Sequence, residues 1–176
     1  HAVGADLEAL ARLDEAAIHY TRAATIRQAL APDDPQLART YNNLGRLCYL
    51  RGDLDDARRF HLAALQLRRA ALGDDHPDTA TSYNNLGAVD LDAGDVDAAL
   101  AHFTRARELR ERSLGPDHPY LAVSLHNLGE VHALRGELDL AEQLAVQALA
   151  IRRGRSGDAH PETARTRPAL GALGLR

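Results

Sequence analysis

The chain has 176 residues, with 21 basic against 25 acidic side chains and a net charge of −4. This weakly acidic balance argues against a nucleic-acid partner, which would select a basic surface. No stretch approaches the roughly 18 consecutive apolar residues that a membrane helix needs. The single cysteine, Cys48, has no second thiol to pair with, which fits a reducing compartment. We therefore expect a cytoplasmic module that contacts neither nucleic acid nor membrane.

Three residue types, Lys, Met and Trp, are absent from the chain, and the first two are informative about its origin. Every basic residue is Arg, with no Lys, and there is no Met at any position. The first absence, together with abundant Ala, Leu, Asp and Gly, is typical of a GC-rich bacterial genome. The second predicts that the chain is a piece of a larger protein.

The sequence repeats itself with a period of 42 residues. A Leu-Gly pair and a proline both recur at this spacing, and only the first unit is one residue shorter. The pairs begin at Leu44, Leu86, Leu128 and Leu170, and the prolines are Pro35, Pro77, Pro119 and Pro161. Such self-similarity is the signature of a repeat architecture.

Within each unit the pattern predicts a helix, a short turn and a longer helix. The first unit, 1–34, is truncated and starts inside its first helix. In the second unit, 35–76, Pro35 opens a helix that runs to about residue 50 and ends at Gly52, and Asp53 caps a second helix of about 20 residues. Units 77–118 and 119–160 repeat this pattern. In 161–176, Pro168 interrupts the expected helix, so this segment is interpreted as a degenerate fifth-unit helix or a capping tail.

One helix pair cannot bury both of its apolar faces, so successive pairs have to stack. The predicted fold class is therefore all-α: an α-solenoid of stacked antiparallel helix pairs. Gly45 and the alanines of the second helix remove bulk where the two helices approach. His61 stands where the next unit has Phe103, which predicts a ring packed in the core.

The unit resembles the tetratricopeptide repeat (TPR), whose pattern is an aromatic, Leu-Gly, then small, aromatic, small and Pro positions. In the second unit these are Tyr41, Leu44, Gly45, Ala57, His61, Ala64 and Pro77. The period of 42 and the Asp-His-Pro loops are similar to the kinesin-light-chain subclass. The resemblance covers 1–163. It implies a module that binds a peptide or protein segment in its concave groove, as the sensor or regulatory arm of a larger signalling or transcriptional regulator.

Asparagines recur on one side of each first helix. Spacings of four, three and four residues put Arg39, Asn43, Arg46 and Leu50 on one face, away from core-facing Tyr41. In the resembled family this face lines the groove, and its Asn bonds the main chain of a bound peptide, since an amide offers a donor and an acceptor. The candidate peptide-binding residues are Asn43, Asn85, Asn127, Asn42, Asn84, Arg39 and Arg46.

The same asparagines allow a second interpretation. Each could hydrogen-bond to the adjoining helix and hold the stack together, without touching a partner. The arginines on this face of the second unit favour a partner segment with acidic residues there. That partner is a protein or peptide, either separate or another domain of the parent chain.

No enzyme motif is present in the sequence, neither a glycine-rich phosphate loop nor His-Glu-x-x-His. We therefore expect no catalytic residue, no cofactor and no metal. His76, His118 and His160 are interpreted as turn-shaping residues, because stacked units would hold them too far apart to share a zinc ion. Cys48 is interpreted as a core residue. The charged clusters around Arg68, Arg110 and Arg152 are interpreted as solvent-exposed.

Two other functions stay open at this point. One is structural: oligomerisation, including a homodimer, through the ends of the solenoid, since the truncated first unit would expose an apolar surface. The other is small-molecule sensing, with an effector held in the groove.

Overall fold

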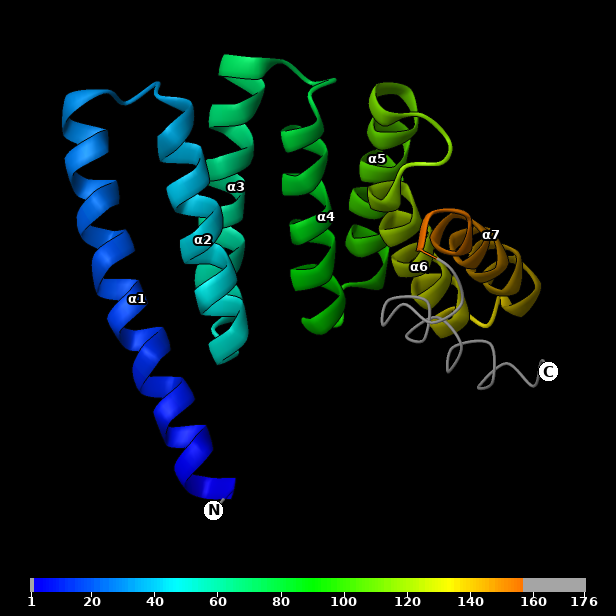
Figure 1. Ribbon diagram of the computed structural model, residues 1–176, viewed down its shortest axis with the longest axis horizontal. Coiled ribbons are helices and arrows are strands. Elements are labelled where there is room, and N and C mark those ends of the chain that lie inside the picture. Colours follow the sequence, from blue (N-terminus) through cyan, green and yellow to red (C-terminus); the bar gives the residue numbers. More distant parts are fainter. Residues whose placement is uncertain (1, 157–176) are drawn as a thin grey trace.

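The computed structural model describes the backbone of residues 2–156 and the side chains of residues 12–154. Over residues 2–156 the chain forms seven α-helices and no strand, placed one after another along the molecule (Figure 1). The helices are α1 (Ala2–Leu30), α2 (Pro35–Arg51), α3 (Leu54–Leu72), α4 (Pro77–Asp92), α5 (Val96–Leu114), α6 (Pro119–Leu134) and α7 (Leu138–Ser156). The all-α prediction is confirmed.

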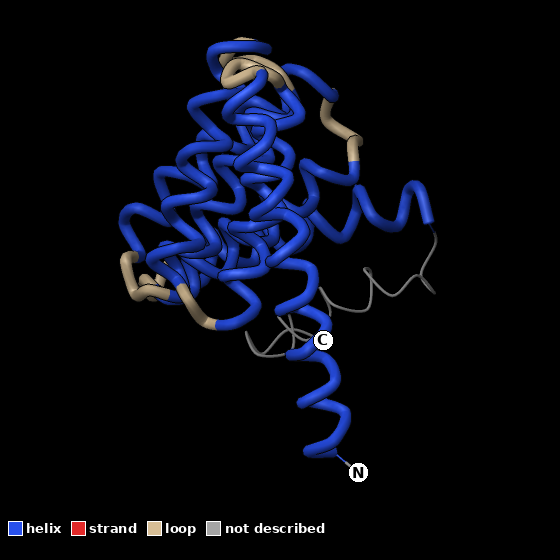
Figure 2. The backbone as a smooth tube through the Cα atoms, turned by 90° about the vertical axis from the view of Figure 1, so that its left-hand side faces the viewer, coloured by secondary structure: helices blue, strands red, loops and turns tan. Residues whose placement is uncertain are grey.

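From α2 onward the helices form antiparallel pairs. Helix α2 packs along α3, α4 along α5 and α6 along α7, while α3 packs on α4 and α5 on α6. In addition α2 contacts α4, and α4 contacts α6, so the first helices of successive pairs lie next to one another. Figures 1 and 2 show the resulting stack from two directions. This arrangement is the predicted α-solenoid.

Helices α2, α4 and α6 each begin at a proline that follows a side-chain N-cap. Asp34 accepts a hydrogen bond from the backbone N–H of Gln36, directly before α2. His76 and His118 do the same before α4 and α6, each accepting through Nδ1 at 3.1 Å. Their interpretation as turn-shaping residues is confirmed. Asp53 does hold the N-cap position of α3, but its side chain makes no capping hydrogen bond.

The two helices of a pair meet at a glycine. A Cβ atom added to Gly45 would lie 2.8 Å from the ring of His61, and one added to Gly87 would lie 2.7 Å from the ring of Phe103. Both rings are buried, so the prediction that His61 is a core ring is confirmed. Burial, and next the nearby charge of Arg68, lower the pKa of His61 to about 4, so the ring is neutral at physiological pH.

The first unit differs from the expected pattern. Its 29 residues from Ala2 to Leu30 form one continuous helix, with no turn between a first and a second helix. Both views show the beginning of this helix extending beyond the rest of the stack (Figures 1 and 2). The sequence explains the difference: Ala11 occupies the repeat position where Gly52 adopts a left-handed conformation with φ of 82°. Alanine disfavours that conformation and favours helix, so the helix continues.

The predicted fifth-unit segment, 161–176 with Pro168, and His160 before it lie outside the described residues. Among the helices that are described, none combines the length and the apolar character that crossing a bilayer requires.

Candidate functional site

The predicted asparagines gather on neighbouring helices. They lie on α2, α4 and α6, and all five are half-buried. Nδ2 of Asn85 donates to Oδ1 of Asn42 at 2.8 Å, and Nδ2 of Asn127 donates to Oδ1 of Asn84 at 3.2 Å. Each bond joins the first helix of one unit to the first helix of the next. We call this surface of α2, α4 and α6, with Asn42, Asn43, Asn84, Asn85 and Asn127, the asparagine face.

The orientation of the amides in the Asn84–Asn127 pair is fixed by a third residue, Arg110. Nη1 of Arg110 donates to Oδ1 of Asn84 at 3.0 Å. Because a guanidinium can only donate, the acceptor must be the carbonyl oxygen of Asn84, and Asn127 has to donate through its amide nitrogen. This leaves Nδ2 of Asn84 and Oδ1 of Asn127 without a hydrogen bond among the described residues, and neither is an orphaned buried atom.

The Asn42–Asn85 pair likewise leaves one amide nitrogen and one carbonyl oxygen without a hydrogen bond within residues 12–154. Nδ2 of Asn42 and Oδ1 of Asn85 have no partner in the described part of the chain. Asn43, the remaining member, makes no side-chain hydrogen bond to any described residue. The asparagine face therefore holds the stack together, as the second interpretation states, and still offers donors and acceptors.

Arg39 and Arg46 lie one turn before and one turn after the asparagines of α2. Both are exposed, and neither forms an ion pair with a described carboxylate. A pocket of about 430 Å³ opens beside Arg39, between α2, α3 and the start of α4. Its lining residues are Pro35, Gln36, Arg39, Asn42, Asn43, Arg68, Leu72 and Asp78. Three of the seven predicted residues thus share one depression.

Toward the end of α4 and on α6, the asparagine face carries two exposed carboxylates, Asp92 and Glu130. Asp92, near the end of α4, accepts a hydrogen bond from the hydroxyl of Tyr49 on α2. Burial, this hydrogen bond and the charges of Asp92 and Glu130 raise the pKa of Tyr49 to about 12. Glu130 pairs with His126 at 3.4 Å, and the hydrogen bond from His126 lowers the pKa of Glu130. Glu130 is therefore ionised near neutral pH.

A row of buried arginines was missed by the sequence reasoning, and the interpretation of Arg68 and Arg110 as solvent-exposed is wrong. Their exposed fractions are 6% and 3%. Arg68 donates to Oγ of Ser82, and Arg110 donates to Oγ of Ser124, each at 2.8 Å. Burial lowers the pKa of Arg110 to about 10, so it stays charged. These guanidinium groups are tolerated inside the stack because hydroxyl and carbonyl oxygens of the following unit accept hydrogen bonds from them.

The signal for this row was in the sequence. Arg27, Arg68, Arg110 and Arg152 follow the repeat spacing. So do the hydroxyl residues that face three of them, in the next unit's first helix: Thr40, Ser82 and Ser124. A charged residue that repeats in phase with a hydroxyl residue points to a buried pair rather than to a solvated face.

A second buried charge has no equivalent in the other units. Asp90 on α4 is fully buried and lies 2.6 Å from Nη1 of Arg58 on α3. Its other oxygen lies 2.5 Å from Nδ1 of His102 on α5. At the same repeat position the chain has Cys48, buried as predicted, and His132. Because the repeat pattern does not contain this carboxylate, periodicity could not predict the cluster.

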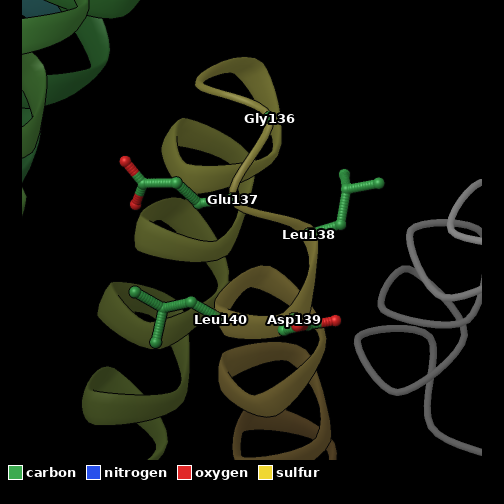
Figure 3. A pocket seen from close by; sticks show the side chains of 5 residues that line it. All are labelled: Gly136, Glu137, Leu138, Asp139 and Leu140. Carbon is green, nitrogen blue, oxygen red and sulfur yellow. The ribbon is translucent and has the colours of Figure 1, made fainter.

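Two further depressions among the described residues contain none of the predicted residues. One of about 490 Å³ lies at the turn between α6 and α7, lined by residues 136–140. Its side chains splay apart: Glu137 and Leu140 point to one side and Leu138 to the other (Figure 3). No group of three His, Cys, Asp or Glu side chains within the described residues could hold a metal ion.

The comparison with protein families decides what the repeat is. The sequence profile of the family described as "Tetratricopeptide repeat" matches residues 1–65, 49–111 and 83–154. The chain belongs to the tetratricopeptide repeat family. TPR folds generally mediate protein–protein interactions, and TPR proteins are typically non-catalytic scaffolds. No curated protein sequence matches the chain.

Solved TPR structures agree with this assignment. The chain is similar to the crystal structure of BtubC (BKLC) from P. vanneervenii, with 27% identity and a TM-score of 0.82 over 92% of this chain and 65% of that one. It therefore spans less than two thirds of the length of BtubC. The putative kinesin light chain TPR-like repeats of Podosopora anserina match with 19% identity and a TM-score of 0.76, covering 98% and 82% of the two chains.

A third TPR structure shows the same fold with lower overlap. The N-terminal domain of stress-induced protein-1 (STI-1) from C. elegans has 19% identity and a TM-score of 0.57, over 77% of this chain and 95% of that one. The solved structures that share the fold thus include kinesin-light-chain repeats, the subclass that the 42-residue period predicted.

Proposed function

We propose that this TPR module binds an extended protein or peptide segment along the asparagine face, through the main chain of that segment. The observation that carries the proposal is the state of the two asparagine pairs. Each pair uses one N–H and one carbonyl oxygen to join neighbouring units, and keeps a complete amide NH2 group on one residue and the carbonyl oxygen of the other unused among the described residues. A peptide unit of a partner needs one acceptor and one donor. Each pair can therefore satisfy one peptide unit.

The geometry of the pairs also favours binding energetically. The amides of Asn42 and Asn85 are oriented by the bond between them, and those of Asn84 and Asn127 by their own bond and by Arg110. Little conformational freedom remains to be lost when a partner arrives, which is the usual source of affinity in a preorganised site. The asparagines can therefore both hold the stack together and bind a partner, because the bonds between units also orient the amide groups that remain without a hydrogen bond in the described chain.

The identity of the partner follows from the surroundings of the face. Exposed Arg39 and Arg46 select a segment with an acidic residue over α2. Such a segment belongs to another protein or to another domain of the parent chain. We place the module in a bacterial, cytoplasmic signalling protein or transcriptional regulator, as its sensor or regulatory arm. The family's general role in protein–protein interaction supports this assignment.

Asn43 gives the sharpest test, because its side chain makes no hydrogen bond to any described residue. Binders would first be selected from a displayed library of random short peptides. Asn43→Ala should then weaken the selected binders about 2- to 10-fold, the effect of one lost hydrogen bond, and leave the melting temperature unchanged. Asn85→Ala should lower both affinity and melting temperature, because it also removes the bond to Asn42.

Gln66→Ala is the matched control, since Gln66 is an exposed polar residue on α3. It should change neither affinity nor melting temperature. If neither Asn43→Ala nor Asn85→Ala weakens binding of the selected peptides, the asparagine face is not the binding surface.

A second function is favoured by the outer side of α1. Ile18 and Leu30 are 67% and 81% exposed, and Ile18 lines a depression of about 500 Å³ together with Arg22 and Arg51. We propose, as the alternative, self-association of the module through this helix. Sedimentation of the wild type and of Ile18→Glu with Leu30→Glu would test it: a dimer that the substitutions dissociate supports self-association, and a monomeric wild type refutes it.

A further inference from the structure

We infer that the segment bound on the asparagine face carries an acidic side chain over α2 and a basic side chain over α6, so that charge fixes the direction in which it lies. This inference rests on the proposed function. It adds the partner's charge order, which main-chain contacts do not determine.

The acidic side chain is assigned by the two unpaired arginines. Arg39 and Arg46 are seven residues apart, two helical turns, and so project from the same face of α2 on either side of the asparagines. The equivalent positions are Thr81 and Ala88 on α4, so positive charge is confined to α2. Most other described arginines have an acidic or hydroxyl partner, for example Arg58 with Asp90 and Arg135 with Asp97. Arg39 and Arg46 have none among the described residues, and they are free to bind a carboxylate.

The basic side chain is assigned by two carboxylates from neighbouring helices. Glu130 on α6 holds the repeat position that Arg46 holds on α2, and Asp92 on α4 holds that of Leu50, so both carboxylates lie on the face that the sequence spacing defines, and both are exposed. The side-chain partners of the two are the Tyr49 hydroxyl and the imidazole of His126, and no described arginine neutralises either carboxylate. Two exposed carboxylates in this arrangement favour an ammonium or guanidinium group from a partner.

The asparagines alone would accept a segment in either direction. Every peptide unit presents one N–H and one C=O whichever way the chain runs. In the reversed direction, however, the partner's base would approach Arg46 and its acid would approach Glu130. Like charges placed together penalise the wrong arrangement, so the charge order discriminates between the two directions.

The experiment exchanges the charges of the face. The probe is a displayed library of random short peptides, selected in parallel on the wild type and on the double variant Arg46→Glu with Glu130→Arg. Both positions are exposed, and the helical content of the variant is checked by circular dichroism. Peptides from the wild-type selection should have acidic residues toward one end and basic residues toward the other. The variant should select no consistent charge order, because Arg39 and Asp92 remain and cancel the exchanged charges.

Defined peptides make the comparison quantitative. One selected sequence is synthesised together with a version in which each acidic residue is exchanged with a basic one. The wild type should bind the exchanged version about 3- to 30-fold more weakly, and the variant should bind the two versions with similar affinity. The preference should disappear near 1 M NaCl, where charges are screened within about 3 Å.

The outcomes separate this inference from the function on which it rests. Selected peptides that need Asn43 or Asn85 but show no charge order, or whose preference is the same on the double variant, would overturn the charge assignment and leave main-chain binding intact. A selection that yields no peptide above background, or peptides indifferent to both Asn43→Ala and Asn85→Ala, would overturn the proposed function and this inference with it.

Discussion

The glycine of each first helix sets how closely the two helices of a unit can approach, and unit three shows how much depends on it. Gly87→Ala would place a methyl group 2.7 Å from the Cδ1 and Cε1 atoms of Phe103, a ring that is 1% exposed and has no space into which to move. Overpacking of this kind costs about 1–3 kcal/mol. The better helix propensity of Ala returns about 1 kcal/mol. We therefore expect a net destabilisation of up to about 2 kcal/mol, and a larger one for Gly87→Leu.

Unit four contains the matched control. A methyl group at Gly129 would have the backbone oxygen of Ala141 as its nearest neighbour, at 3.3 Å, because Ala145 replaces the aromatic ring there. Gly129→Ala should thus be neutral or stabilising. Both variants would be followed by urea unfolding monitored through helical circular dichroism. Adding Phe103→Ala to Gly87→Ala should remove most of the effect of the methyl group. If the two glycine variants unfold at the same urea concentration, the assigned contact between α4 and α5 is incorrect.

Other expectations concern the buried polar groups. The pKa of His61 is about 4 in the folded chain against about 6.5 when unfolded, so the unfolded state binds more protons below pH 6.5. The buried neutral ring contributes its full stability, of order 3 kcal/mol, above pH 6.5, and this contribution is lost as the pH falls toward 4. His61→Phe should therefore reduce the change of melting temperature with pH over this window. Arg110→Met should destabilise the fold by about 1.5–3 kcal/mol in the same urea assay, because it leaves Ser124, Asn84 and a carbonyl of α6 without their charged donor. An unchanged urea midpoint would mean that Arg110 contributes no net stability.

Much of the fold could be predicted from periodicity alone. The repeat places the start of α2 at Pro35, and the helix ends within one residue of the predicted boundary. The core position of His61 followed from its equivalence to Phe103. These features are dictated by what every unit shares, because each unit has to solve the same packing problem.

Features that belong to one unit, or to the contact between two, were harder to predict. Helix α1 is continuous where Ala11 and Arg12 replace the Gly52-Asp53 pair of the next unit, and within the described residues the Asp90 cluster is found at a single interface. The side of the helix on which the asparagines lie followed from their spacing. Which amide donates to which could not be read from one helix, since it depends on Arg110 and on the neighbouring unit.

The buried arginines have a consequence for how such a chain can change in length. Arg27, Arg68 and Arg110 each find a hydroxyl partner in the following unit, so each depends on its neighbour to satisfy its guanidinium group. Removing or duplicating 42 residues in register returns an arginine opposite Ser or Thr at the new junction, whatever unit is affected. A change of another length is tolerated in a loop, since one residue fewer separates Arg27 from Thr40 than separates Arg68 from Ser82, and both pairs form. Inside a helix, an insertion or deletion that rotates the arginine away from its hydroxyl partner breaks the pair. The row therefore favours growth and loss of the array in whole units.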